Sequence, residues 1–159
     1  MSSRLATFTV LAALSAAPAS AHALEVVSVL SIPAMELAAG ADTNIALRLL
    51  VRRGYHVQAN PVENPSLIPI TLTIEPVEGI SVGAPLYPRA KRLRLAGDDQ
   101  DLVVYDGTFV IALPVNAGPD IAGASFTLKG SLRYQACDDR HCLFPVTLPI
   151  AIPVSVEGR

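Results

Sequence analysis

The two cysteines of this sequence lie close together, in the segment Cys137-Asp138-Asp139-Arg140-His141-Cys142. Six residues can be closed by a disulfide if the chain turns back and brings the two Cα atoms within about 7 Å. Chain-entropy theory assigns a loop of about six residues only about 2 kcal/mol of stabilisation, near the bottom of the useful range. A structural staple gains more by joining distant strands, so the spacing favours a redox-active pair over a structural bond.

Charged neighbours distinguish the two sulfur atoms. Arg140 and His141 directly precede Cys142, whereas two aspartates follow Cys137. Positive charge stabilises a thiolate and negative charge opposes it. We therefore expect Cys142 to ionise more readily and to form the mixed disulfide with a partner, with Cys137 as the resolving thiol. Solvent screening weakens this bias where the charges are exposed. The predicted strand that leads directly into Cys137 should also keep that sulfur near the sheet and less accessible than Cys142.

Metal binding and a purely structural disulfide are the alternatives to redox chemistry. The available ligands are Cys137, Cys142, His141 and, farther along the chain, His56. Two thiolates suit a soft monovalent copper ion, whereas zinc requires four close ligands and the sequence has no second pair. His56 follows a turn, where a lone histidine is more often a surface or hydrogen-bonded residue. The sequence therefore predicts no resident metal and no cofactor, and copper binding stays open as an alternative.

Composition and motifs exclude several other classes of protein. The chain has 159 residues, 51% of them hydrophobic and 16% charged, which excludes a disordered chain. A net charge of −2, no tryptophan and few aromatic residues argue against nucleic-acid binding. No Gly-x-Ser-x-Gly motif supports a hydrolase. The basic segment Arg89–Arg94 is interpreted as a solvated loop whose charge is balanced by the aspartates that follow it, Asp98, Asp99 and Asp101. A docking or shielding loop is the functional alternative.

The segments that must position the cysteine loop show the period-two pattern of β-strands. Apolar residues alternate with more polar ones, as in strands with one buried face. No segment has the pattern of an amphipathic helix outside the N-terminus. We expect strands at 25–31, 45–52, 68–74, 102–105, 107–115 and 126–136. Many short strands joined by turns predict an all-β fold, an antiparallel two-sheet sandwich, with a barrel as the alternative.

The last predicted strand, Val146–Val156, carries two prolines four positions apart, Pro149 and Pro153. Alternate residues of a strand direct their backbone N–H groups to the same side, so both missing donors lie along one edge. Proline is tolerated in a sheet where that side is unpaired. The pattern therefore predicts an edge strand and favours an open sandwich over a closed barrel.

The N-terminal segment reads as a secretory signal peptide. Arg4 is followed by an apolar run from Leu5 to Ala17, and small residues at 19, 21 and 23 fit a cleavage site. We expect a signal peptide at 1–23, cleaved near 21 or 23, and a single β-sandwich domain at 24–159. Export would place the cysteines in an oxidising compartment.

The segment 130–145, Gly-Ser-Leu-Arg-Tyr-Gln-Ala-Cys-Asp-Asp-Arg-His-Cys-Leu-Phe-Pro, resembles the N-terminal periplasmic domain of the thiol:disulfide interchange protein DsbD family. The tyrosine-glutamine-small-cysteine entry and the proline after the second cysteine carry the resemblance. Segments 54–61 and 67–72, together with Leu86-Tyr87-Pro88 and Tyr105-Asp106-Gly107, are similar to further elements of that family. The resemblance extends over roughly 45–156.

The resemblance implies an immunoglobulin-like sandwich whose cysteine pair, Cys137 and Cys142, alternates between disulfide and dithiol in the periplasm. Such a domain receives electrons from a membrane-embedded donor, here expected to be a separate chain, and passes them to periplasmic thioredoxin-like proteins. We expect a monomer. The resemblance also implies possible modulators and a possible cap loop that shields the cysteines. The modulators are Tyr134, Asp138, Asp139, Arg140 and His141, and the cap loop contains Tyr87, Pro88 and Arg89.

Overall fold

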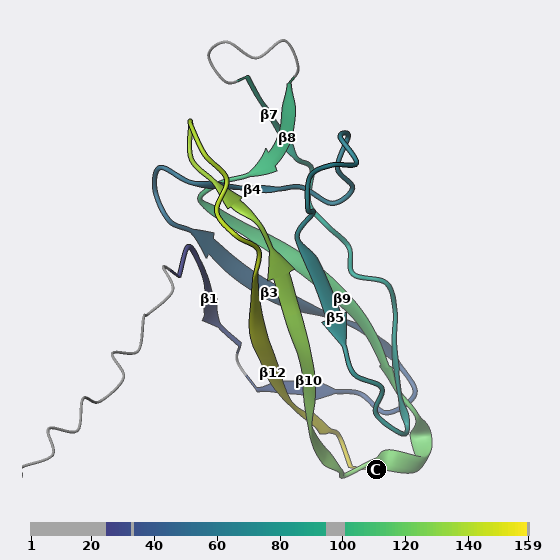
Figure 1. The fold of residues 1–159 in the computed structure, drawn as a ribbon. Helices are drawn as coiled ribbons and strands as arrows, with labels where there is room; N and C mark the ends of the chain where they lie inside the picture. Colours follow the sequence, from purple (N-terminus) through teal and green to yellow (C-terminus); the bar gives the residue numbers. More distant parts are fainter. Residues whose placement is uncertain (1–24, 33, 95–100, 159) are drawn as a thin grey trace, which may run out of the picture.

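The computed structural model describes residues 25–32, 34–94 and 101–158 (Figure 1). This part of the chain is built from strands, with one short 3-10 helix at Pro119–Ile121. None of its helices is long and apolar enough to cross a membrane. The predicted signal peptide lies outside the described residues.

Three four-stranded sheets make up the fold. The first has the order β1 (Val27–Ser31), β3 (Asp42–Val51), β9 (Thr108–Ala117) and β6 (Ile80–Val82). The second has the order β2 (Met35–Leu37), β12 (Val146–Val156), β10 (Ser125–Tyr134) and β5 (Thr71–Ile74). The third has the order β11 (Ala136–Cys137), β4 (His56–Gln58), β8 (Leu102–Tyr105) and β7 (Lys91–Leu93). All strand pairs are antiparallel except β2 with β12.

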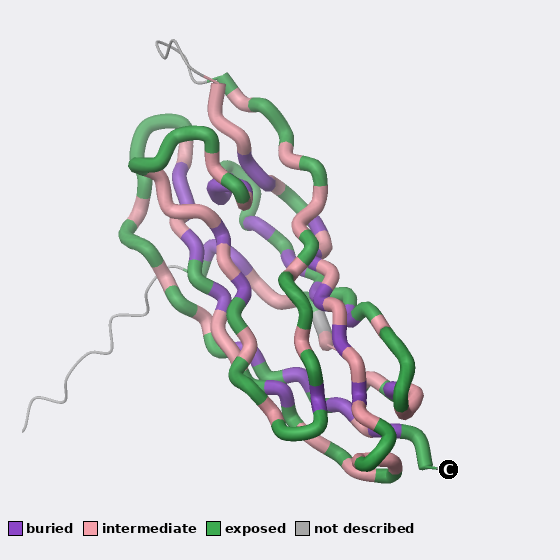
Figure 2. The backbone as a smooth tube through the Cα atoms, turned by 90° about the vertical axis from the view of Figure 1, so that its right-hand side faces the viewer, coloured by how far each residue is buried: buried purple, intermediate pink, exposed green. Residues whose placement is uncertain are grey.

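One hydrophobic core lies between the first two sheets. Leu47 and Ile111 come from the first sheet, Leu132 and Ile152 come from the second, and all four are fully buried in the same cluster. Buried and more exposed residues alternate along the long strands, and Figure 2 shows the burial of the described residues. This alternation is the pattern of a sandwich with one solvated face on each sheet. The predicted all-β, immunoglobulin-like sandwich is therefore confirmed, and the barrel alternative is not.

The strand β12 largely behaves as the predicted edge strand. It pairs with β10 along its whole length, from Val146 to Ser155. On its other side, among the described residues, β2 pairs only with the three residues from Val154 to Val156. The edge prediction therefore holds from Val146 to Pro153, and it is wrong for the last three residues, which form a short parallel pair.

Two other boundaries differ from the expected strands. The strand expected at 68–74 begins only at Thr71, because the carbonyl of Ile70 accepts a hydrogen bond from the Asn60 side chain (2.9 Å). Pro69, which has no backbone N–H, also lies in 68–70, the part of the predicted strand that does not form. The strand expected at 126–136 divides into β10, which stays in the second sheet, and β11, which joins the third.

The third sheet lies at one end of the sandwich and holds the cysteines (Figure 1). Its strand β4 begins after a tight turn in which Gly54 has a φ of 86°, a conformation that glycine adopts without strain. The pairing β11–β4–β8 then places Cys137 beside His56. This small sheet is the element that positions the candidate site.

Candidate functional site

Cys137 and Cys142 form a disulfide at the tip of the hairpin that joins β11 to β12. Their Cα atoms are 3.9 Å apart, well within the distance that the sequence argument required, and the two residues pair as an antiparallel bridge. Inside the loop, the backbone N–H of Asp138 donates to the carbonyl of His141 at 2.9 Å. The disulfide therefore closes a short loop that also has its own backbone hydrogen bond.

The carboxylate of Asp138 accepts hydrogen bonds from within the loop. Its Oδ1 accepts hydrogen bonds from the backbone N–H groups of Arg140 and His141, both at 2.7 Å. These two bonds, Arg140 first, lower the pKa of Asp138 below its ordinary value. Asp138 therefore orders the backbone that leads into Cys142.

The two sulfur-bearing residues differ sharply in exposure. Cys137 lies on β11 and is only 2% exposed, whereas Cys142 is exposed at the open side of the hairpin. A partner's sulfur approaching from solvent therefore meets Cys142 first. This is the accessibility difference that the sequence suggested from the position of Cys137 directly after a strand.

Two buried polar side chains lie beside Cys137 on the neighbouring strand β4. The amide Nε2 of Gln58 donates a hydrogen bond to the Sγ of Cys137 at 3.5 Å. His56 pairs directly with Cys137 in the strand register and is 4% exposed. The Nε2 of His56 and the Oε1 of Gln58 are buried and have no hydrogen-bond partner among the residues that the structure describes.

Two roles were expected for His56, a surface residue or a hydrogen-bonded one, and the surface role is wrong. Sequence reasoning missed Gln58 altogether. The reason is that all three residues of β4 are buried, so the strand shows no alternation. The signal that could have been used is the glycine turn at Gly54, followed by two polar residues, at 56 and 58, that share one face of a strand.

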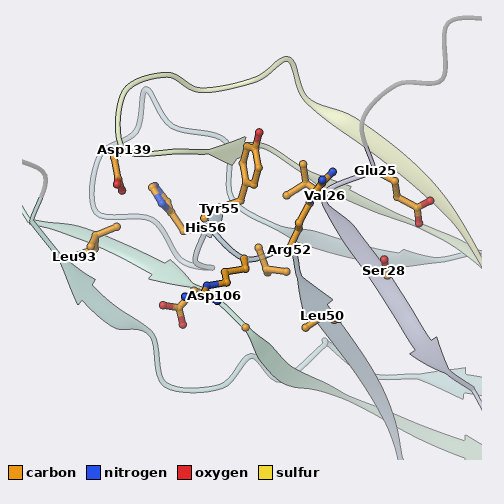
Figure 3. Close-up of a pocket in the computed structure, with 14 residues that line it drawn as sticks. Glu25, Val26, Ser28, Leu50, Arg52, Tyr55, His56, Leu93, Asp106 and Asp139 are labelled. Atoms are coloured by element: carbon orange, nitrogen blue, oxygen red, sulfur yellow. The ribbon is translucent and has the colours of Figure 1, made fainter.

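Burial lowers the pKa of His56, because a buried imidazole loses the hydration that favours its charged form. Three carboxylates oppose this effect and raise the pKa, in the order Asp139, Asp106 and Asp138. Figure 3 shows the ring of His56 pointing toward Asp139. Both residues line an open pocket of about 790 Å³ between the cysteine hairpin and the ends of β1 and β3.

A second, smaller cavity of about 210 Å³ lies directly at the disulfide. It is lined by both cysteines and by His56 and Gln58 behind them. Asn64 and Leu67, from the loop between β4 and β5, and Leu102 of β8 complete its wall. The residues that border the cysteines therefore include this loop, which the sequence did not single out.

The structure does not place the expected cap-loop residues in this cavity. The hydroxyl of Tyr87 accepts a hydrogen bond from the backbone N–H of Leu72 at 3.0 Å. The carbonyl of Pro88 accepts one from the hydroxyl of Tyr105, also at 3.0 Å. Arg89 lines a separate pocket together with Pro88. In this conformation Tyr87 and Pro88 are tied to β5 and β8, and they border neither sulfur atom.

The hydroxyl of Tyr134 likewise faces away from the cysteines. Tyr134 is 1% exposed, and its hydroxyl accepts a hydrogen bond from the backbone N–H of Val27 at 3.3 Å. This contact joins the end of β10 to the start of β1. Tyr134 therefore links the two sheets of the sandwich.

The interpretation of the basic segment as a loop is wrong, because Lys91–Leu93 forms β7 and pairs with β8. Its charges are balanced by carboxylates from several elements, and one of these is the aspartate expected to balance the segment. The ion pairs are Lys91 with Asp106, Arg92 with Glu63 (2.7 Å), and Arg94 with Asp101 (2.7 Å). The other aspartates expected there, Asp98 and Asp99, lie outside the described residues.

Phe144 is 93% exposed, two positions after Cys142. The backbone N–H and the backbone carbonyl of the preceding residue, Leu143, both form hydrogen bonds. The N–H of Leu143 donates to the carbonyl of Ala136 at 2.8 Å, and its carbonyl accepts from the side chain of Gln135 at 3.1 Å. The hairpin therefore presents an aromatic ring to solvent on a well-anchored backbone.

In the part of the chain that the structure describes, no group of three or more His, Cys, Asp and Glu side chains is arranged to hold a metal ion. His141, one of the ligands considered for copper, is exposed on the loop. His56, the other histidine considered, lies behind Cys137.

Comparisons with known proteins identify the relatives of this chain. A family model described as "Thiol:disulfide interchange protein DsbD, N-terminal" matches residues 25–152. Among solved structures, the chain is similar to the N-terminal domain of Neisseria meningitidis DsbD in the reduced form. The identity is 21%, the match covers 76% of this chain and 82% of that chain, and the TM-score is 0.47.

The chain is also similar to the N-terminal periplasmic domain of ScsB from Proteus mirabilis. Here the identity is 13%, the match covers 76% of this chain and 43% of that chain, and the TM-score is 0.49. No protein among the curated sequences matches the chain.

Proposed function

This chain belongs to the family of DsbD N-terminal domains, and from that premise we propose that it relays reducing equivalents to thioredoxin-like proteins through Cys137 and Cys142. Thiol–disulfide exchange is the chemistry of the family, and the chain carries a disulfide within the residues that the family model matches. The observation that carries the proposal is the asymmetry of this pair. One sulfur is buried against a strand, and the other is open to solvent at the tip of the molecule.

The relay has two steps. In the reduced domain, the thiolate of Cys142 attacks the disulfide of the partner, forms a mixed disulfide and releases one partner thiolate. The thiolate of Cys137 then attacks the sulfur of Cys142, restores the internal disulfide and releases the second partner thiolate. Two electrons pass to the partner, whose two thiolates take up protons. A separate membrane-embedded donor returns the pair to the dithiol.

The loop residues adjust the reactivity of Cys142 in this proposal. Arg140 and His141 place positive or titratable groups next to it, and positive charge favours a thiolate. Asp138 holds the loop backbone through its two hydrogen bonds. The signal peptide expected at 1–23 supports a periplasmic location for the exchange.

A trapping experiment tests the proposal. The Cys137→Ser variant keeps the attacking thiol but cannot resolve the mixed disulfide, so it should accumulate a covalent complex with a periplasmic thioredoxin-like protein that lacks its own resolving cysteine. The Cys142→Ser variant should trap little, because its remaining thiol is buried. Non-reducing electrophoresis and mass spectrometry measure the complex.

The outcomes separate the role of each cysteine from the function itself. Equal trapping by both variants would contradict the assignment of Cys142 but not the exchange function. If neither variant forms a complex and the wild-type disulfide resists exchange with a thioredoxin-like protein, the bond is structural and the proposal fails.

A further inference from the structure

We propose that His56 accepts the proton of the Cys137 thiol in the second step of exchange, while Gln58 holds the Cys137 sulfur by a hydrogen bond. The inference rests on the proposed function, which requires Cys137 to become a thiolate inside the protein. It assigns a role to two side chains that belong to β4 rather than to the cysteine loop.

The strand register places His56 next to Cys137. The two residues are direct partners in the antiparallel pair β4–β11. Directly opposed residues of such a pair direct their side chains to the same face, with Cβ atoms about 4.5–5.5 Å apart. Both side chains also line the small cavity at the disulfide. His56 is therefore a direct cross-strand neighbour of the buried sulfur.

Buried polar atoms without partners are uncommon, because they lose water without gaining a protein hydrogen bond. Two such atoms, the Nε2 of His56 and the Oε1 of Gln58, occur together beside the disulfide. The oxidised Cys137 carries no hydrogen and cannot satisfy them. Reduction creates a thiol hydrogen at this place, and the unpaired Nε2 of His56 can accept it. An acceptor that has no partner in the oxidised protein therefore gains one in the reduced protein, a state that the exchange cycle requires.

The charges around His56 fit a proton acceptor. Burial keeps the imidazole neutral in the oxidised protein, since its pKa is lowered, and a neutral imidazole can take up a proton. Negative and positive side chains face this region from the hairpin loop, from the segment after β8 and from the ends of β1 and β3. They are Asp138, Asp139, Arg140, His141, Asp106, Glu25, Arg52 and Arg53. The carboxylates nearest to His56 stabilise the imidazolium when it forms.

Before the second step, the mixed disulfide joins Cys142 to the partner, and Cys137 is a thiol. The proton of this thiol moves to the Nε2 of His56, and the resulting thiolate attacks the sulfur of Cys142. The new Cys137–Cys142 bond forms as the bond to the partner breaks, and the electron pair leaves with the partner's thiolate. The imidazolium then loses its proton to solvent. The N–H of Gln58 stabilises the thiolate by donating to it, as it already donates to the sulfur in the disulfide.

The test uses glutathione disulfide as a small partner, so that no physiological protein is needed. The reduced protein is mixed with glutathione disulfide, samples are quenched in acid, and mass spectrometry follows the Cys142–glutathione adduct and its resolution. We expect His56→Gln to slow resolution about tenfold at about pH 6.5, where few thiols ionise unaided. The two rates should converge above about pH 9, where hydroxide generates the thiolate without a base.

A stability control separates proton transfer from a loosened fold. Ile111→Val, in the core on β9, should cost about 1 kcal/mol of stability and leave the pH profile of resolution unchanged. A His56→Gln profile parallel to the wild type at every pH would overturn the inference. If the wild-type protein forms no adduct or never resolves it, the proposed exchange function fails instead.

A measurement on the unmutated protein covers the case in which His56→Gln does not fold. Ring nitrogen chemical shifts of His56 are followed by NMR against pH in the oxidised and the reduced protein. We expect the imidazole of the reduced protein to gain its proton at a lower pH, because the Cys137 thiol then donates a hydrogen bond to the neutral ring. Identical titrations in the two states would show that His56 does not share a proton with Cys137.

Discussion

Phe144 is an exposed aromatic residue two positions after the exposed cysteine. Phe144 is 93% exposed, more than any other large hydrophobic residue of the part of the chain that the structure describes. Aromatic residues next to a reacting group are frequent anchors in interfaces, because they bury a large area with few rotatable bonds. The anchored backbone of Leu143 reduces the entropy that this ring would lose on docking.

We expect Phe144→Ala to lower kcat/KM for reduction of a thioredoxin-like partner about tenfold, the effect of losing a moderate interface anchor. Stability should change by less than about 0.5 kcal/mol, since the ring packs on little in the free protein. Leu86→Ala is the matched control, because Leu86 is also exposed but pairs with Ala112, away from the hairpin. Equal losses for both variants, or none for Phe144→Ala, would contradict the docking role.

The two cysteines could be predicted from the sequence, whereas the buried polar residues beside Cys137 could not. Cys137 and Cys142 were identified from their spacing and their neighbours, because the two cysteines and the charged residues beside them are adjacent in the sequence. His56 and Gln58 lie 79 or more positions away from Cys137, and only the pairing of β4 with β11 brings them to the sulfur. Long-range strand register leaves no trace in a single short strand, so these two residues required the structure.

Among the elements, β10 depends on a glycine at its centre. Gly130 pairs with Ile74 of β5 on one side and with Ile150 of β12 on the other. A Cβ at this position would press on the backbone carbonyl of Thr73 and lie 2.8 Å from the Cδ1 of Ile74. The second sheet therefore closes around β10 only because this residue has no side chain.

Gly130→Ala should destabilise the protein by about 1–3 kcal/mol, the usual cost of overpacking a site that cannot relax. Urea unfolding followed by circular dichroism measures the change. Gly158→Ala is the control, since a Cβ there meets nothing within 4 Å. A Gly130→Ala variant as stable as the control would mean that β5 shifts at little cost.

The strands that the sequence predicted are those with a clear period of two. β3, β9, β10 and β12 each bury one face over ten or more residues, and alternation made them visible. Short strands such as β4 and β7 were missed, because three residues contain too little pattern to separate a strand from a loop. Those short strands form half of the sheet that holds the site.

For the whole molecule, the disulfide is peripheral to what holds the fold together. The hydrophobic cluster lies between the two large sheets, and neither cysteine belongs to it. Closing a loop of about six residues contributes only about 2 kcal/mol, compared with a typical total of 5–15 kcal/mol. The domain can therefore pass through both redox states without losing its core.

We expect the reduced protein to remain folded at 25 °C, with a melting temperature roughly 5–10 °C lower than that of the oxidised protein. Circular dichroism spectra and thermal melts of the two forms check this. Global unfolding on reduction would mean that the bond is structural, and the redox proposal would lose its main physical support.

The position of the disulfide at one end of a long sandwich also determines how the protein is best held for measurement. The strand β12 leaves the cysteine hairpin at Val146 and runs to Val156 at the opposite end, roughly 33 Å away at the usual rise per residue. A biotin or a surface linker attached after β12 therefore keeps the sensor surface a full strand length from the sulfur atoms. Immobilised in this orientation, every molecule offers its reactive end to the flowing partner, so binding and covalent capture can be timed on one chip.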